Sequence, residues 1–267
     1  MDRFLSFLPA YFYSILACLY LFSIGWVFRK NRNLIHDMAR RFRSPFIART
    51  AIPEADLAEM GENIPSVILP AAERASAYNT SLFEFVALGT LIQRFSPKAI
   101  FEIGTFKGRT ATYMALNSSP GTVIYTLDLP RGAEGRPGLK MERGDREFIS
   151  GSGFEARSLN AEGRAKIKLL YGDSASFDFS PFNGAVDLVF VDGSHSYEYV
   201  LNDSKIALSL LRKAGGVIVW HDYGSWDGVT RALNELYASD PAFKGLRRIK
   251  DTSFACLVKG QGGKEEI

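Results

Sequence analysis

The chain has 267 residues, of which 46% are hydrophobic and 23% are charged, proportions that exclude a disordered chain and a protein with many membrane spans. The formal net charge is only +3, whereas residues 29–49 alone have an excess of +6, so the rest of the chain is not basic and a broad basic face for nucleic-acid binding is disfavoured. The two cysteines, Cys18 and Cys256, are too few for a disulfide framework or a cysteine-rich zinc site.

An uncharged segment of 25 residues, 4–28, lies near the N-terminus. About 20 apolar residues suffice to cross a bilayer as a helix, and basic residues, which favour the cytoplasmic side, follow from Arg29 to Arg43. The segment therefore predicts a single transmembrane helix, with the rest of the chain in the cytoplasm. A hydrophobic helix packed on the domain or on a partner chain is the alternative.

Changes in composition divide the chain into four parts. They are a membrane anchor over 1–30, a basic juxtamembrane linker over 31–70, an α/β domain over 71–260 and a tail over 261–267. The basic linker is suited to anionic lipid headgroups.

Short apolar runs alternate with helix-like segments through the third part. A helix-like spacing covers 71–95, strands are expected at 98–103, 122–127, 166–171, 186–191 and 216–220, and helices at 108–117, 197–213 and 227–238. This alternation predicts a doubly wound, mostly parallel sheet with right-handed crossovers. Two last strands, 246–250 and 253–259, are too close in sequence for a crossover and predict an antiparallel hairpin, which makes seven strands. Residues 131–165, rich in glycine and charge, are expected to form a long insertion or lid.

Polar residues follow the strands at the edge where open α/β sheets bind ligands. The first strand continues into FEIGTFKGRT at 101–110, where Gly104 permits a tight turn and Gly108 opens a helix. This spacing matches neither the dinucleotide fingerprint nor a phosphate loop. Asp128 follows the second strand, where an acid can accept hydrogen bonds from ribose hydroxyls. The later strands are followed by Asp173, by Asp192, and by His221 with Asp222.

These motifs resemble those of class I methyltransferases that use S-adenosylmethionine, in particular the branch with catechol and macrocin-type sugar O-methyltransferases. The resemblance covers about residues 75–260, including the terminal hairpin. It implies a set of cofactor-binding residues: Glu102, Gly104 and Thr105 at the methionine end, with Gly108 opening the helix beside them, Asp128 at the ribose, and Asp173 with Ser174 beside the adenine.

The stretches VDLVFVDGSHSYEYV and GGVIVWHDY resemble the metal and substrate edge of that family. In metal-dependent relatives an acid at the place of Asp192, with two acidic or amide residues after the fifth strand, holds Mg²⁺. This chain departs from the pattern because His221 precedes Asp222. A magnesium site of Asp192, Asp222 and His221 and a site without metal both stay open.

His195 follows Asp192 by three residues, as a histidine does in related sugar methyltransferases, which implies a general base. An imidazole is mostly unprotonated near neutral pH, yet basic enough to take a proton from an attacking alcohol. Asp192 is the second residue assigned to catalysis. Simpler roles are a helix cap for Asp192, a solvent-facing turn residue for His195 and a bond to a backbone carbonyl for His221.

The sequence thus predicts a membrane-anchored methyltransferase that acts on a hydroxyl of a sugar, a phenol or a membrane-borne precursor. The acceptor is a small molecule or a glycan- or lipid-linked one, and a homo-oligomer is compatible with the sequence. The alternative is a membrane-tethered, non-catalytic binding or scaffold protein that retains the cofactor fold.

Overall fold

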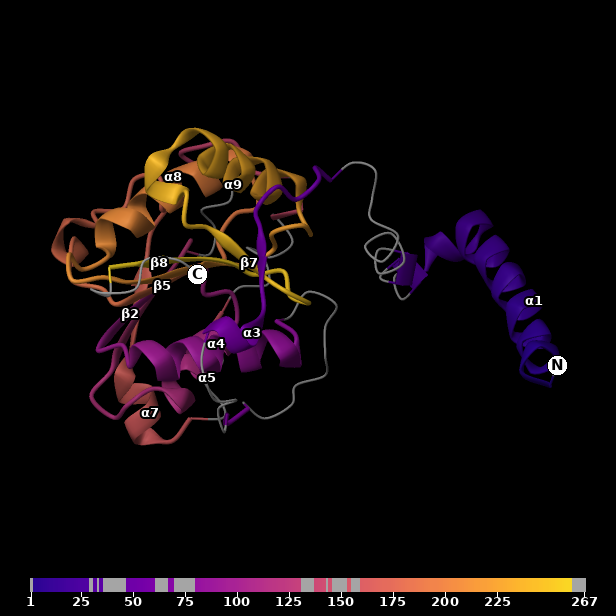
Figure 1. Ribbon diagram of the computed structural model, residues 1–267, viewed down its shortest axis with the longest axis horizontal. Coiled ribbons are helices and arrows are strands. Elements are labelled where there is room, and N and C mark those ends of the chain that lie inside the picture. The colour runs from indigo at the N-terminus through magenta and orange to yellow at the C-terminus, as the bar shows by residue number, and fades with distance from the viewer. Residues whose placement is uncertain are drawn as a thin grey trace. The chain divides into compact units, whose positions relative to one another are not determined.

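The computed structural model describes residues 2–28, 31–32, 34–35, 47–60, 67–69, 80–130, 137–142, 144–145, 153–154 and 159–260. It divides into two units, 1–46 with 75–79 and 47–74 with 80–267, drawn as a ribbon in Figure 1. The predicted tail, 261–267, and much of the predicted linker lie outside the described residues.

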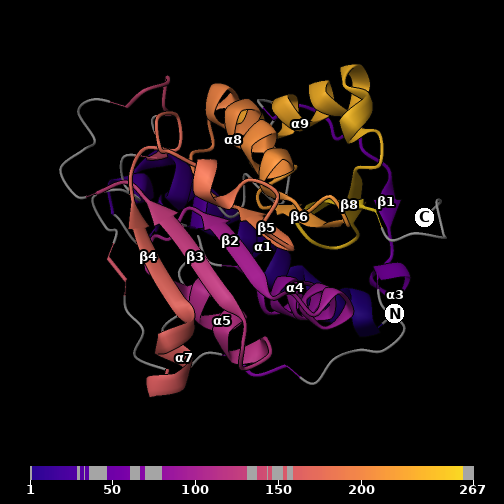
Figure 2. The ribbon, with the colours of Figure 1, turned by 90° about the vertical axis from the view of Figure 1, so that its left-hand side faces the viewer.

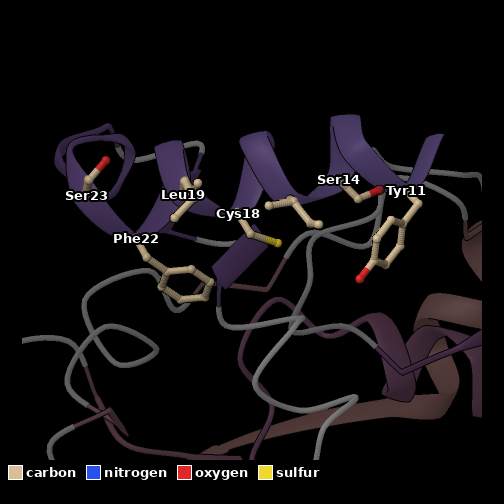
Figure 3. A pocket seen from close by; sticks show the side chains of 7 residues that line it. Tyr11, Ser14, Cys18, Leu19, Phe22 and Ser23 are labelled. Carbon is tan, nitrogen blue, oxygen red and sulfur yellow. The ribbon is translucent and has the colours of Figure 1, made fainter. Parts of the chain in front are cut away.

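The N-terminal unit is built on one α-helix, α1 (Asp2–Ser23). The helix ends where the chain tightens into a 3-10 turn, η1 (Gly25–Val27), and the Trp26 indole nitrogen donates to the Ser23 carbonyl at 3.1 Å. One side of α1 carries a groove of about 520 Å³. The groove is lined by Tyr11, Ser14, Ile15, Cys18, Leu19, Phe22 and Ser23, most of which are labelled in Figure 3.

The prediction of a transmembrane helix over 4–28 is wrong. Of the helices in the described part of the chain, none combines the length and the apolar character that crossing a membrane requires. The uncharged run is not one helix, because α1 ends at Ser23 and the backbone is extended by Phe28. Absence of charge was also a poor measure of apolarity, since Pro9, tyrosines and serines interrupt the run. The predicted localisation, a membrane anchor with a cytoplasmic domain, depended on this helix and is wrong with it.

The second unit contains one eight-stranded sheet, with strand order β1-β7-β8-β6-β5-β2-β3-β4. Its strands are β1 (Glu54–Ala55), β2 (Ala99–Ile103), β3 (Val123–Asp128), β4 (Ile167–Tyr171), β5 (Leu188–Val191), β6 (Gly216–Trp220), β7 (Arg247–Ile249) and β8 (Ala255–Lys259). β8 runs antiparallel to β6 and β7, and the other neighbours are parallel. The seven predicted strands are all present, and the eighth, β1, was missed because two residues carry no periodic pattern.

Helices cover both faces of this sheet, as Figure 2 shows. One face carries α4 (Leu82–Phe95) and α5 (Arg109–Asn117), and the other carries α8 (Tyr197–Leu210) and α9 (Asp227–Ser239). The shorter elements are α3 (Leu57–Met60), α7 (Ala161–Lys166), η2 (Ser180–Phe182) and η3 (Pro241–Phe243).

Alternating side chains of the strands fill two separate cores. In β2, Ile100 packs in the core under α4 and α5, whereas Phe101 and Ile103 pack in the core under α8 and α9. Burying one such side chain contributes about 1.5–3 kcal/mol, so the two cores together hold the helical layers on the sheet.

The strand order reverses between β2 and β5. From β2 the chain proceeds outward through β3 to β4, then crosses to β5 on the other side of β2 and continues to β6. Open α/β sheets bind ligands outside the carboxyl ends of their strands at such a switch point. The residues that follow β2, β3, β5 and β6 therefore form the candidate site.

Candidate functional site

The turn after β2 contacts the end of β5. Gly104 has a φ of +100°, and a Cβ at this position would lie 2.0 Å from the backbone oxygen of Asp192. The Gly104 amide donates to the Leu127 carbonyl at 2.8 Å, and the Asp192 amide donates to the Ile103 carbonyl at 2.8 Å. Only glycine fits this approach, which sets Asp192 beside the turn at 104–108.

Glu102 lies beneath this turn, with only 1% of its surface exposed. Burial raises the pKa of Glu102 well above its usual range, although the Thr126 hydroxyl, which donates to its carboxyl group, opposes the shift. The Thr126 hydroxyl also lies 2.6 Å from that of Thr105. The structure therefore joins Glu102 and Thr105 through one hydroxyl, and it keeps Glu102 covered.

Asp128 ends β3 and faces the same turn. Its carboxylate accepts hydrogen bonds from the backbone amides of Phe106 at 3.1 Å and Leu129 at 3.0 Å. Burial raises the pKa of Asp128 to about 6, because these two donors only partly offset the loss of solvent.

A cavity of about 490 Å³ opens beside Asp128. Its wall includes Thr105, Phe106, Phe154 and Tyr171. The volume falls within the range of about 300–1,000 Å³ that is usual for small-molecule sites. Two predicted cofactor residues, Thr105 and Asp128, thus line one cavity of suitable size.

The pair predicted to lie beside the adenine has other partners. The Asp173 carboxylate accepts from the Gly138 amide at 2.7 Å and from the Tyr199 hydroxyl at 2.9 Å. Ser174 uses its carbonyl to accept from the Asn202 amide group at 3.3 Å. Neither Asp173 nor Ser174 is among the residues that line the 490 Å³ cavity. Tyr199, which comes from α8, is thus a hydrogen-bond donor at this edge of the site.

Asp192, His221 and Asp222 come together as predicted, with one ligand atom of each within 4.8 Å of the others. The Nδ1 atom of His221 lies 3.0 Å from Asp192 Oδ1 and 3.4 Å from Asp222 Oδ2. Burial alone would lower the pKa of His221, but the charges of Asp222 and Asp192 outweigh it and raise that pKa well above its usual range. Two carboxylates and one imidazole also form a donor set that fits a divalent cation such as Mg²⁺ or Mn²⁺.

Glu84 joins this cluster from α4, and sequence reasoning missed it. Its Oε2 atom lies 3.6 Å from His221 Nε2, and its Oε1 atom accepts from the amide and hydroxyl of Ser253 at 2.9 and 2.7 Å. Burial would raise the pKa of Glu84, but the hydrogen bond and charge of His221 lower it far below its usual value. The S-x-x-E spacing of Ser81 and Glu84 is a capping box, which signals the start of α4 but not a role in the site.

His195 is buried at the start of α8, between two carboxylates. Its Nδ1 atom lies 2.6 Å from Asp145 Oδ1 and its Nε2 atom 3.0 Å from Asp222 Oδ2, while the ring stacks on Trp226 at 4.2 Å between centroids. Burial would lower the pKa of His195, but its hydrogen bonds to Asp145 and Asp222 raise it to about 10. A neutral imidazole carries one N–H, so a ring that donates at both nitrogens is protonated. The two carboxylates therefore favour the protonated ring in this arrangement, whereas the sequence predicts a mostly unprotonated one.

The simpler roles considered for these residues are not found. His195 is buried rather than facing solvent. The N-cap of α8 is Ser196, so Asp192 does not cap that helix. His221 bonds to a carboxylate of Asp192 rather than to a backbone carbonyl.

Part of the chain matches the model of a known protein family. A family model described as a methyltransferase domain matches residues 101–223, which include the turn after β2, Asp128 and the cluster after β5 and β6. No curated protein matches the chain.

Similar solved structures are distant in sequence. A putative O-methyltransferase from Klebsiella pneumoniae is 18% identical with a TM-score of 0.45, and 68% of this chain and 82% of that chain are covered. An O-methyltransferase from Bacillus cereus in complex with SAH is 18% identical with a TM-score of 0.45, and 69% of this chain and 84% of that chain are covered. The O-methyltransferase TomG from Streptomyces achromogenes, in complex with SAM, is 17% identical with a TM-score of 0.45, covering 87% and 100%.

Proposed function

With residues 101–223 matched as a methyltransferase domain, the chain is an S-adenosylmethionine-dependent methyltransferase, as its motifs predict, and we propose that it methylates a hydroxyl group of a small-molecule acceptor. A sugar or a phenol is the proposed acceptor class. The observation that carries the proposal is the position of His195. Its ring contacts Asp222, which belongs to the cluster of Asp192, His221 and Asp222 at the carboxyl edge of the sheet.

We place the nucleoside of the cofactor in the cavity beside Asp128. There the Asp128 carboxylate would accept hydrogen bonds from the ribose hydroxyls, and the methionine end would lie over the turn formed by Glu102, Gly104, Thr105 and Gly108. Gly104 supports this placement because only glycine lets the turn pack against the Asp192 backbone, which sets Asp192 beside the proposed methionine end. Asp173 and Ser174 are proposed to lie beside the adenine, which requires the Gly138 amide to leave the Asp173 carboxylate.

Methyl transfer from a sulfonium is an in-line displacement. The acceptor oxygen bonds to the methyl carbon, the carbon–sulfur bond breaks with its electrons going to sulfur, and the hydroxyl proton must leave. We assign that proton to Nε2 of His195. For this step the ring must first release its Nε2 proton to bulk water, and the acceptor hydroxyl must take the place of Asp222 at that nitrogen. Alignment of oxygen, carbon and sulfur supplies much of the remaining rate enhancement.

Asp192, Asp222 and His221 are the residues that would hold a cation. A bound Mg²⁺ or Mn²⁺ would supply a positive charge that lowers the pKa of the acceptor hydroxyl. The chain's own contribution is to orient those three donors, and Glu84 does so for His221 by facing its Nε2 atom.

The test is a transfer assay with methyl-labelled S-adenosylmethionine, the full-length chain and a panel of sugar and phenol acceptors, supplied with Mg²⁺ or Mn²⁺. His195→Gln should lower kcat by about 10²- to 10⁴-fold, because it removes the proton acceptor while retaining size and polarity. Cofactor affinity, measured by calorimetry, should stay nearly unchanged and so report that the variant is folded.

Two outcomes would contradict the proposal. If the parent binds the cofactor but methylates no hydroxyl acceptor, the proposed acceptor class is wrong. If His195→Gln turns over at the parental rate, the proton leaves by another route.

A further inference from the structure

Asp145 ties down the turn that carries His195. It comes from the stretch 131–165 that the sequence predicts to be an insertion, and it is buried, with 4% of its surface exposed. Its carboxylate accepts hydrogen bonds from the Ser194 hydroxyl at 2.5 Å and from the His195 amide at 3.2 Å. One oxygen of the same carboxylate lies 2.6 Å from Nδ1 of His195. One carboxylate therefore contacts the backbone and the side chain of His195, the proposed base, and also the residue before it, Ser194.

The two nitrogens of the His195 ring have different partners, Asp145 at Nδ1 and Asp222 at Nε2. Trp226 stacks on the face of the imidazole with an interplanar angle of 19°, which fixes the plane of the ring but treats both nitrogens alike. A carboxylate accepts hydrogen bonds and does not donate them when ionised, so Asp145 holds a hydrogen on Nδ1. Nε2 is then the nitrogen that faces Asp222 and the cluster.

Asp145 and Asp222 have different surroundings although both contact the same ring. Asp222 belongs to the group of donors that could hold a cation, whereas Asp145 lies outside that group and is bound by Ser194 and His195. A substitution of Asp145 would therefore remove the carboxylate at Nδ1 without removing any of the three donors Asp192, His221 and Asp222.

We propose that Asp145 is a positioning residue for methyl transfer: its carboxylate holds the Nδ1 hydrogen of His195 and so directs Nε2 toward the acceptor hydroxyl. The inference rests on the proposed function, in which Nε2 takes the proton. The predicted insertion then has a role in the reaction, because it supplies the carboxylate that orients His195 at the edge of the sheet.

The first test compares Asp145→Asn with the parent in the transfer assay. The asparagine keeps the size of the side chain but presents only one acceptor oxygen, so kcat should fall about 10²-fold, while KM for the cofactor should change by less than about twofold. Asp187→Asn is the matched control. Asp187 accepts from the amides of Lys98 and Ala99 at the opposite end of the sheet, so its variant should lower stability without this loss of kcat.

The second test is independent of activity. The chain has three histidines, so a spectrum of ¹⁵N-labelled imidazoles is simple to assign with His195→Gln. The parent should show a strongly hydrogen-bonded Nδ1 proton on His195, and Asp145→Asn should lose it. This signal tests the contact even if the parent shows no transfer, which would count against the proposed function alone.

A parental kcat in folded Asp145→Asn would overturn the proposal. So would the absence of the Nδ1 proton signal from the parent, a result that holds even if the variant does not fold.

Discussion

Carboxyl groups in the site ionise differently because their neighbours differ. Glu84 and Asp222 are buried, which favours the neutral acid, but each contacts a histidine whose charge lowers the pKa of the carboxyl group. Burial raises the pKa values of Glu102 and of the partly buried Asp128, because the neutral hydrogen-bond donors that face them only partly oppose it. The acids on the histidine side of the site therefore have lowered pKa values, and the two acids under the proposed cofactor have raised ones.

The raised pKa of Asp128 predicts how cofactor binding depends on pH. The ionised carboxylate is the better acceptor for ribose hydroxyls, and the group is half ionised at about pH 6 in the free protein. Cofactor affinity should therefore rise as the pH increases from about 5 to about 7. Calorimetric titration across this range measures it.

Asp128→Asn should remove both the charge and the pH dependence, with a loss of about 1.5–3 kcal/mol in binding at neutral pH. Asp251→Asn, at an exposed turn, is the control and should follow the parent curve. An unchanged affinity in Asp128→Asn would remove Asp128 from the ribose site.

Most of the residues that sequence reasoning identified lie at the end of a strand or in the turn that follows it. Asp128, Asp192 and His221 are found at the site because parallel strands deliver their carboxyl ends to one edge. Glu84, Asp145 and Trp226 were missed because they reach the site from helices and from the insertion. Their contacts join positions that are distant in the chain, and no local period or turn chemistry encodes such pairings.

Among the elements, the strands were predictable and some helix ends were not. Continuous apolar runs locate β2, β5 and β6, which are buried on both faces. The helix predicted over 197–213 ends instead at Leu210, because Leu211 is extended and forms a bridge with Val186. That ending depends on a partner strand edge, which the local sequence does not show.

Close contact between the ends of β2 and β5 predicts that Gly104→Ala is severely destabilising. A Cβ there would meet the Asp192 backbone at 2.0 Å and would sit at a φ of +100°. A left-handed backbone costs about 1–2 kcal/mol for a residue with a Cβ, and forcing atoms into a filled space adds about 1–3 kcal/mol. The loss in unfolding free energy should be about 2–5 kcal/mol, measured by urea unfolding.

Alanine variants of two other glycines separate the cost of the left-handed backbone from the cost of the steric clash. Gly184 has a φ of +65° with no atom within 4 Å of its Cβ position, so Gly184→Ala should cost only the backbone part, about 1–2 kcal/mol. Gly121 has neither feature, and its alanine variant should be nearly neutral. Equal stability of the Gly104 and Gly184 variants would show that β5 can move away from the turn.

At the scale of the whole second unit, the site depends on all layers of the fold. Glu84 comes from α4 on one face of the sheet, Trp226 precedes α9 on the other face, and the cluster between them lies on strand ends. The separation of these groups is fixed by the two cores, so the charges of the site and the stability of the fold are linked. Protonation of the site should therefore appear in global unfolding.

Without added cofactor or cation, stability should decrease as the pH rises from about 5. Burial raises the pKa of Asp203 to about 7, so between about pH 4 and 7 the folded chain binds more protons than the unfolded chain, and stability falls as the pH rises. The raised pKa of His195, about 10, contributes stability that is complete below about 6.5 and is lost as the pH rises through 10. Both effects have the same sign.

Asp203→Asn separates the first effect from the second. Asn202 donates to the Asp203 carboxyl group at 3.0 Å, and an asparagine oxygen can accept the same bond without a charge to bury. One pKa unit corresponds to about 1.4 kcal/mol, so at pH 8 the variant should be more stable than the parent by about 2–4 kcal/mol. At pH 5 the folded carboxyl group is protonated but that of the unfolded chain is already ionised, so the variant should be more stable than the parent by a smaller margin, about 1–2 kcal/mol. Urea unfolding followed by fluorescence, to which the buried Trp220 contributes, measures both between pH 5 and 9. Parallel curves for parent and variant would mean that Asp203 is ionised in the folded chain at pH 5.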